Sequence, residues 1–166
     1  PDMIGEKQIK TQSESGSMDP SNQSEKPTKQ IKGEYDMSDV KAILEKMKEV
    51  EGFRAIGIFT PQGELAASVN VAGDKLDEMG ALANDVLLKS QKATEIMGVG
   101  RGNMVHITAP NAHVIARCHN EGSDFSQTSA GKAHLHVVLL LNQDGSLAMG
   151  KMKLESLVAE LAPSFR

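Results

Sequence analysis

The chain has 166 residues and a formal net charge of -4, a length that ordinarily forms one domain around one hydrophobic core. With four Phe, one Tyr and no Trp, that core must be built from aliphatic residues and methionine. The mixed charges form no basic patch interleaved with aromatic side chains, which argues against nucleic acid as a partner. Cys118 is the only cysteine, so an intrachain disulfide is excluded.

We expect a cytoplasmic protein without membrane insertion. A single cysteine and the absence of a signal-peptide pattern favour a reducing compartment. The longest apolar run, Val137 to Leu141, is far too short to cross a bilayer.

Residues 1–36 are rich in Ser, Gln, Lys, Glu and Gly, and their few apolar positions follow no helix or strand period. Such a segment cannot bury enough surface to offset the entropy lost on ordering. The interpretation is a disordered polar tail. An alternative is that Met37 is the true start and the upstream residues are not native. The domain itself is predicted to span residues 37–166.

The first predicted helix has Ser38 as its N-cap and ends before Gly52. Two strands follow, at residues 53–59 and 64–71, joined by a turn at residues 60–63 whose Pro and Gly occupy favoured turn positions. These strands are expected to form a hairpin. The helix is predicted from apolar residues at the 3.6-residue period, namely Val40, Ile43, Leu44, Met47 and Val50.

The longest predicted helix spans residues 74–97, with Asp74 as its N-cap and Gly98 as its stop signal. Its apolar stripe is wider than contact with one sheet requires, and it includes small residues that permit close approach of another backbone. We therefore predict a second contact, with another copy of the domain. Deep burial within one monomer is the competing interpretation. The stripe comprises Leu76, Met79, Gly80, Leu82, Ala83, Val86, Leu87, Ser90, Ala93, Thr94 and Met97.

Three further strands are predicted at residues 104–109, 113–119 and 133–141, with a Gly/Ser-rich loop at 120–132. A last helix begins at a Ser146 N-cap and is terminated by Pro163. The order α-β-β-α-β-β-β-α predicts an α+β fold (an α/β sandwich). Its five-stranded antiparallel-type sheet is expected in the order 2-1-5-4-3, with the long middle helix on one face and the terminal helices on the other. The third strand is then an edge that needs protection or pairing.

Two segments, Val50 to Phe59 and Gln62 to Ser68, resemble the opening hairpin of Roadblock/LC7 domains of the bacterial and archaeal type that accompanies small GTPases. The long middle helix running into residues 97–100 fits the same family. The resemblance covers residues 37 to about 161 and departs from the family at the loop 120–132, where many members turn tightly.

The resemblance implies homodimers, or heterodimers with a paralogous Roadblock domain, formed through the middle helix and the edge strand. It also implies a non-enzymatic scaffold or adaptor that binds a Ras-like small GTPase, or a larger signalling or motility complex, and can regulate GTP hydrolysis by that partner. An alternative is a profilin- or PAS-like sensory module, with a small ligand facing Ala55, Gly57, His134 and His136. The expected dimer interface comprises Met79, Leu82, Ala83, Val86, Leu87, Ser90, Ala93, Met104, His106 and Thr108.

His134 and His136 share one face of a predicted strand, and Cys118 and His119 lie on the preceding strand, so a hairpin could gather several metal-binding side chains. Their spacing matches no metal motif, and Cys118 and His119 point to opposite faces. We therefore expect no metal or cofactor, with zinc as the competing interpretation and pH-tuned dimerisation as a further role for the histidines. A Cys–His nucleophile lacks an orienting third group, so no catalytic residue is predicted.

Overall fold

The structure is a computed structural model that describes residues 37–124 and 127–166, apart from the side chain of residue 81. Both interpretations of residues 1–36 concern a segment outside the described residues. The described elements are α1 (Met37–Glu45), the 3-10 helix η1 (Lys46–Glu49), β1 (Phe53–Phe59), β2 (Leu65–Asn70), α2 (Leu76–Ile96), β3 (Met104–Ala109), β4 (Ala112–Asn120), β5 (His134–Asn142), α3 (Leu147–Leu161) and the 3-10 helix η2 (Ala162–Phe165).

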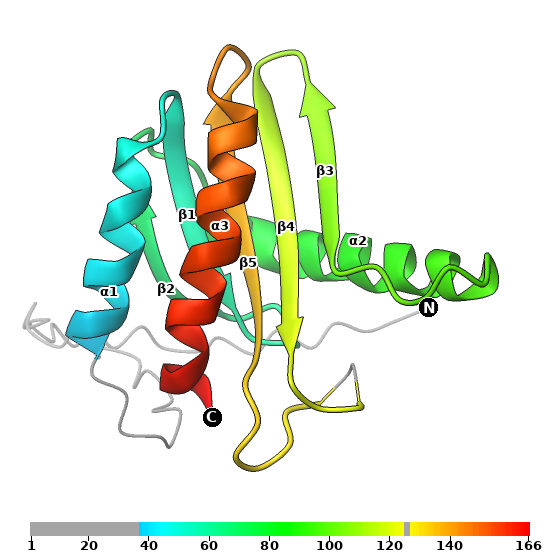
Figure 1. The fold of residues 1–166 in the computed structure, drawn as a ribbon. Coiled ribbons are helices and arrows are strands. Elements are labelled where there is room, and N and C mark those ends of the chain that lie inside the picture. Colours follow the sequence, from blue (N-terminus) through cyan, green and yellow to red (C-terminus); the bar gives the residue numbers. More distant parts are fainter. Residues whose placement is uncertain (1–36, 125–126) are drawn as a thin grey trace, which may run out of the picture. The chain divides into compact units, whose positions relative to one another are not determined.

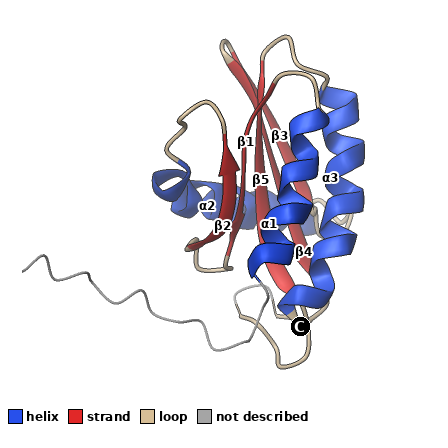
Figure 2. Cartoon of the chain, turned by 90° about the vertical axis from the view of Figure 1, so that its left-hand side faces the viewer, coloured by secondary structure: helices blue, strands red, loops and turns tan. Residues whose placement is uncertain are grey.

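The five strands form one antiparallel sheet in the order β2-β1-β5-β4-β3 (Figure 1). Helices α1 and α3 cover one face of the sheet, and α2 lies against the other (Figure 2). The predicted α+β fold, its strand order and its placement of helices are therefore confirmed. Among the described helices, none combines the length and apolar character that a membrane span requires.

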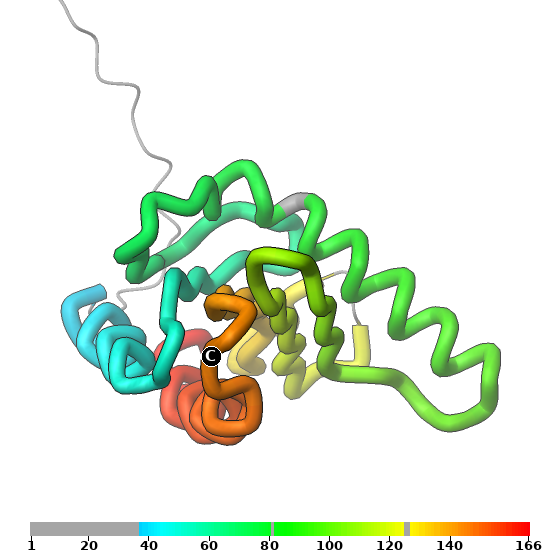
Figure 3. The backbone as a smooth tube through the Cα atoms, turned by 90° about the horizontal axis from the view of Figure 1, so that it is seen from above, coloured from blue at the N-terminus to red at the C-terminus, as the bar shows by residue number. Residues whose placement is uncertain are grey.

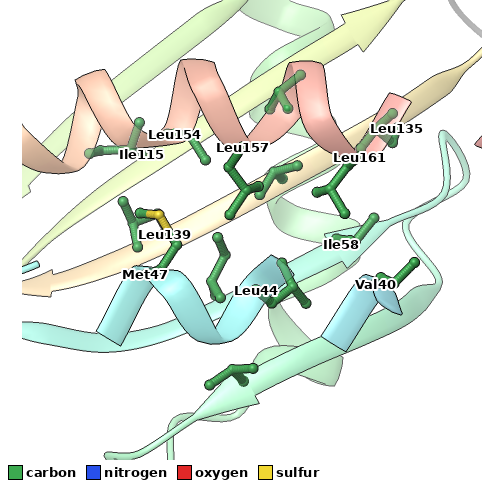
Figure 4. Close-up of a cluster of buried hydrophobic side chains, with 14 of the residues drawn as sticks. Val40, Leu44, Met47, Ile58, Ile115, Leu135, Leu139, Leu154, Leu157 and Leu161 are labelled. Atoms are coloured by element: carbon green, nitrogen blue, oxygen red, sulfur yellow. The ribbon is translucent and has the colours of Figure 1, made fainter. Parts of the chain in front are cut away.

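The core between the sheet and the pair α1/α3 is almost wholly aliphatic (Figure 4). Strand β5 supplies alternate residues to it, because successive side chains of a strand point to opposite faces. Leu139 and Leu154 are fully buried there. The central strands are buried on both faces, as their nearly continuous apolar sequence predicts. This core also contains Val40, Leu44, Met47, Ile58, Ile115, Leu135, Leu157 and Leu161.

Two predicted N-caps are wrong. Helix α1 already includes Met37, so Ser38 lies within its first turn. Helix α2 is preceded by Lys75, and the Asp74 carboxylate instead forms a two-point ion pair with Arg54 of β1, at 2.7 Å and 3.2 Å. A charge-assisted bidentate pair is stronger than a neutral capping hydrogen bond, which explains why Asp74 turns towards the strand.

The other predicted helix boundaries are closer to the structure. Gly52 and Gly98 have positive φ angles of 78° and 71°, as residues that end helices often do. Ser146 occupies the N-cap position of α3, although its side chain makes no capping hydrogen bond. The α-helix α3 ends at Leu161, two residues before Pro163, as predicted. The 3-10 helix η2 follows with Pro in its first turn, where its missing N–H is tolerated.

Candidate interaction surface and the Cys–His cluster

Helix α2 crosses the sheet, and its C-terminal turns extend past the edge strand β3 (Figures 1 and 3). Its N-terminal half sits very close to the first hairpin. At Gly80, an added Cβ would lie 2.5 Å from the Phe59 ring and closer still to the Gly63 carbonyl oxygen. Gly80 therefore fixes how the N-terminal half of α2 packs on the first hairpin. The C-terminal turns of the helix extend beyond the edge of the sheet.

The outer side of α2 exposes large apolar side chains. Leu82, Val86, Ala93 and Met97 recur at intervals of four, seven and four residues, which places them on one side of the helix. Leu82 and Met97 are 67% and 71% exposed, although apolar side chains of this size are usually covered. Beyond them, Ile96 and Val99 are also exposed, as is Ile107 on β3. We call Leu82, Val86, Ala93, Ile96, Met97, Val99 and Ile107 the outer apolar surface.

The predicted interface residues divide into three groups by exposure. Leu87 is fully buried against the sheet of its own chain, where it packs in the core beneath α2. It is therefore unavailable to a partner, which corrects the expectation for that residue. Leu82, Val86, Ala93 and Thr108 are exposed; Met79, Ala83, Ser90, Met104 and His106 are half-buried.

Among the described strands, β3 lies at the edge of the sheet and pairs only with β4, so its outer backbone edge is open. The Cys118 amide donates to the Asn103 carbonyl at 2.8 Å, so the paired residues Met104 and Arg117 exchange no hydrogen bond. By the alternation of an antiparallel ladder, the N–H and C=O groups of Met104, His106 and Thr108 point away from β4. Three predicted interface residues thus present their backbone to the edge.

The side chains of β3 have the opposite phase. Met104 packs towards the α1/α3 core, while Val105 packs towards α2. The exposed Ile107 therefore lies on the α2 face of the sheet. The His106 ring nitrogen Nε2 lies 3.1 Å from Nδ1 of His113. Sequence reasoning missed Ile107 because the sequence of β3 alone does not reveal which of its two alternating sets of side chains faces α2.

Cys118, His134 and His136 come together on the α2 face, across the neighbouring strands β4 and β5. One ligand atom from each lies within 4.8 Å of the other two, and all three residues are buried. The Cys118 Sγ atom is 3.9 Å from His134 Nε2. His119 lies on the other face, 3.8 Å from the Glu121 carboxylate. The predicted gathering of the three side chains, and the separation of His119 from them, are both observed.

Burial governs the protonation of this cluster. It raises the pKa of the Cys118 thiol, and it lowers the pKa of His136 to about 4. Burial also lowers the pKa of His134. Near neutral pH the cluster therefore consists of a thiol and two neutral imidazoles. An activated cysteine nucleophile requires the opposite, a lowered thiol pKa, so the cluster is poorly suited to nucleophilic catalysis.

No family model and no curated protein sequence matches this chain. Solved structures do match it. A structure described as MglB with tetrameric arrangement is 16% identical with a TM-score of 0.64, covering 78% of this chain and 89% of that one. The gliding protein MglB from Thermus thermophilus is 15% identical with a TM-score of 0.64, covering 78% of this chain and 90% of that one.

A Roadblock/LC7 domain from Streptomyces avermitilis is 14% identical with a TM-score of 0.57, covering 72% of this chain and 92% of that one. At such identities the likeness concerns the fold, and the fold agrees with the hairpin resemblance seen in the sequence. The chain therefore has the Roadblock/LC7 fold.

Proposed function

We propose that this protein is a non-catalytic adaptor that forms dimers, with itself or with a paralogous Roadblock domain, through α2 and β3. In this proposal the dimer binds a Ras-like small GTPase within a motility or signalling complex and regulates it. The observation that supports the proposal most strongly is the outer apolar surface, which lies next to the open edge of β3.

The two features complement each other in space. A second β3 strand laid against the open edge would satisfy its backbone groups and extend the sheet. Because α2 reaches past β3, its C-terminal turns would then lie over the partner's strands (Figure 3). A two-fold axis at the strand pair would give the partner's helix the same position over this chain. Specific interfaces bury about 1,600 Å² in total, which a strand and a long helix can supply.

The GTPase part of the proposal rests on what the resemblance to Roadblock/LC7 domains implies, and the motility part on the names of structural neighbours. One neighbour is described as MglB with tetrameric arrangement, and another as a gliding protein, MglB. Those words apply to the neighbours. For this chain they motivate the choice of a motility complex. A non-catalytic role is supported by the Cys118 thiol, which is buried and whose pKa is raised by that burial.

A profilin- or PAS-like ligand module would need open space over the central strands. At Gly57, the smallest central position, an added Cβ would lie 3.0 Å from the Phe59 ring and 3.1 Å from Leu65. The space left by the missing side chain is therefore already filled. This observation favours the adaptor over the sensory module.

The test of dimerisation is a charge placed on the outer apolar surface. Val86→Asp would bury a carboxylate in the proposed interface, at a cost that two-fold symmetry doubles, so we expect a monomer by multi-angle light scattering. Lys92→Asp, on an exposed part of the same helix, is the matched control and should remain dimeric. Circular dichroism checks that both variants fold. A wild-type protein that stays monomeric at high concentration would contradict the proposal.

The partner class is tested separately. GTP hydrolysis by a Ras-like GTPase encoded beside this protein is measured alone and with the wild-type dimer, and a changed rate is expected. An unchanged rate together with no binding of the GTPase in either nucleotide state would reject that part and leave dimerisation standing.

A further inference from the structure

The cluster of Cys118, His134 and His136 has no role in the proposed adaptor surface, yet its composition and burial are unusual. The three residues are 3%, 4% and 2% exposed. All three project from the sheet towards α2, with Cys118 paired directly to His136 across β4 and β5. A plain core would place aliphatic side chains here, as the opposite face of β5 does with Leu135, Val137, Leu139 and Leu141.

We propose that Cys118 Sγ, His134 Nε2 and one ring nitrogen of His136 bind a divalent transition-metal ion of the zinc class. A thiolate with two imidazoles is a donor set that zinc and its first-row neighbours prefer. The ion would be held beneath α2, between the ends of β4 and β5.

The spacing of the donor atoms fits such an ion. Zinc–sulfur and zinc–nitrogen bonds of roughly 2.3 Å and 2.0–2.1 Å place the two donors of a tetrahedral site about 3.6 Å apart. The observed separation of Cys118 Sγ from His134 Nε2 is 3.9 Å. A small shift of either side chain would bring these two donors to that spacing. The His136 donor lies within 4.8 Å of both and would also move inward on binding.

His136 points most directly to a missing ligand. Within the described residues, neither of its ring nitrogens has a hydrogen-bond partner, although both are buried. Buried polar atoms in folded proteins are nearly always paired, because an unpaired one loses its hydration without compensation. A metal ion bonded to one nitrogen would remove half of this deficit.

His134 is already oriented as a metal ligand. Its Nδ1 lies 2.8 Å from the Gln127 carbonyl oxygen. A carbonyl can only accept, so Nδ1 carries the proton and Nε2 keeps its lone pair, which is directed into the cluster beside Cys118. Metal-binding histidines are commonly fixed in this way by a carbonyl on their second nitrogen. The carbonyl comes from the loop between β4 and β5, the segment in which this chain departs from the Roadblock pattern.

Gln91 completes the surroundings from the side of α2. It is buried. Burial raises the pKa of the Cys118 thiol, and the Gln91 side chain acts in the opposite direction, towards the thiolate form. Three protein ligands leave the fourth position of a tetrahedral ion to the Gln91 amide oxygen or to water. Binding replaces the thiol proton of Cys118, so one proton is released to solvent for each ion bound.

The experiment uses cobalt(II) as a spectroscopic probe for the zinc site. The full chain is stripped with a chelator under reducing conditions and titrated with Co²⁺. We expect one ion per chain, absorption bands of tetrahedral cobalt, a sulfur-to-cobalt charge-transfer band, and loss of these signals when Zn²⁺ is added. Cys118→Ser should abolish the charge-transfer band. His136→Gln should weaken binding at least about tenfold, since it removes a direct ligand.

His113→Gln is the matched control, because His113 is buried on the same sheet but contacts His106 on the face away from the cluster. It should bind cobalt as the wild type does. No stoichiometric binding by the wild type, or a charge-transfer band that survives Cys118→Ser, would overturn the proposal. Binding lost equally in the control would also overturn it. If His136→Gln does not fold, the wild-type and Cys118→Ser spectra decide the question alone.

Discussion

The two faces of the sheet are built in different ways. The α1/α3 face is a continuous aliphatic core, closed within one chain by Leu139, Leu154 and their neighbours. The α2 face is smaller and mixed, since it buries Cys118, Gln91 and two histidines, and its helix leaves large apolar side chains exposed. Within the described residues, the α2 face thus leaves large apolar side chains exposed and both ring nitrogens of His136 without hydrogen-bond partners.

If the proposed function holds, this difference separates stability from binding within one small domain. In most of a folded protein, local propensity, hydrophobic pattern and packing all favour the same structure. Positions that depart from this agreement tend to be functional. Here the departures lie on the α2 face: the outer apolar surface, the open edge of β3 and the imidazole of His136. We therefore assign stability mainly to the α1/α3 face and binding to the α2 face.

The largest effect is expected from a cavity in the closed face. Leu139→Ala removes a fully buried side chain from the centre of the α1/α3 core, and should lower the free energy of unfolding by about 2–5 kcal/mol. Met152→Ala changes a side chain on α3 that is 61% exposed, and should have an effect within about 0.5 kcal/mol. Urea unfolding measures both. Equal effects would show that Leu139 is not held in a closely packed core, and would contradict the account of the α1/α3 face.

A smaller change in the free energy of unfolding is expected from a substitution at Gly80, and its sign is informative. In an exposed helix, Gly→Ala stabilises by roughly 0.5–1 kcal/mol. At this position the new methyl group would meet the Phe59 ring and the Gly63 carbonyl, so Gly80→Ala should instead destabilise by about 1–3 kcal/mol. Urea unfolding at fixed protein concentration gives the sign. A stabilised variant would show that α2 packs more loosely on the hairpin than described.

The smallest effect concerns pH and the Glu121–Arg166 ion pair. The Arg166 guanidinium and the Ala133 amide lower the pKa of Glu121 to about 2. A carboxyl with a lowered pKa stabilises the fold above its usual value of 4.5, and that contribution is lost as the pH falls towards 2. The urea midpoint of the wild type should therefore approach that of Glu121→Gln as the pH is lowered from 7 to 3. A difference that is constant with pH would contradict the ion pair.

The element order and the closed face follow from local patterns in the sequence. In each element the sequence pattern alone shows which residues are buried. This holds for the helical spacing of Val40, Leu44 and Met47 and for the unbroken apolar run of β5. Few long-range details are needed to place them. The strand order then follows because short antiparallel connections leave few alternatives.

The details of the α2 face depend on contacts distant in sequence. Asp74 fits a helix cap until Arg54, twenty residues earlier, is brought beside it. The exposure of Ile107 depends on the phase of β3, and the orientation of His134 depends on a loop carbonyl. The alternation of residues along the two predicted strands indicated that Cys118, His134 and His136 could meet. Their burial and the missing partners of His136 required the structure.

The central claim, that β3 pairs with a second copy, is tested most directly by amide hydrogen exchange on a ¹⁵N-labelled sample. The N–H groups of Val105 and Ile107 bond to β4 and should exchange slowly at every concentration. The outward N–H groups of His106 and Thr108 should be protected in concentrated wild-type protein and lose that protection on dilution or in Val86→Asp. Fast exchange of His106 and Thr108 at all concentrations would contradict the account.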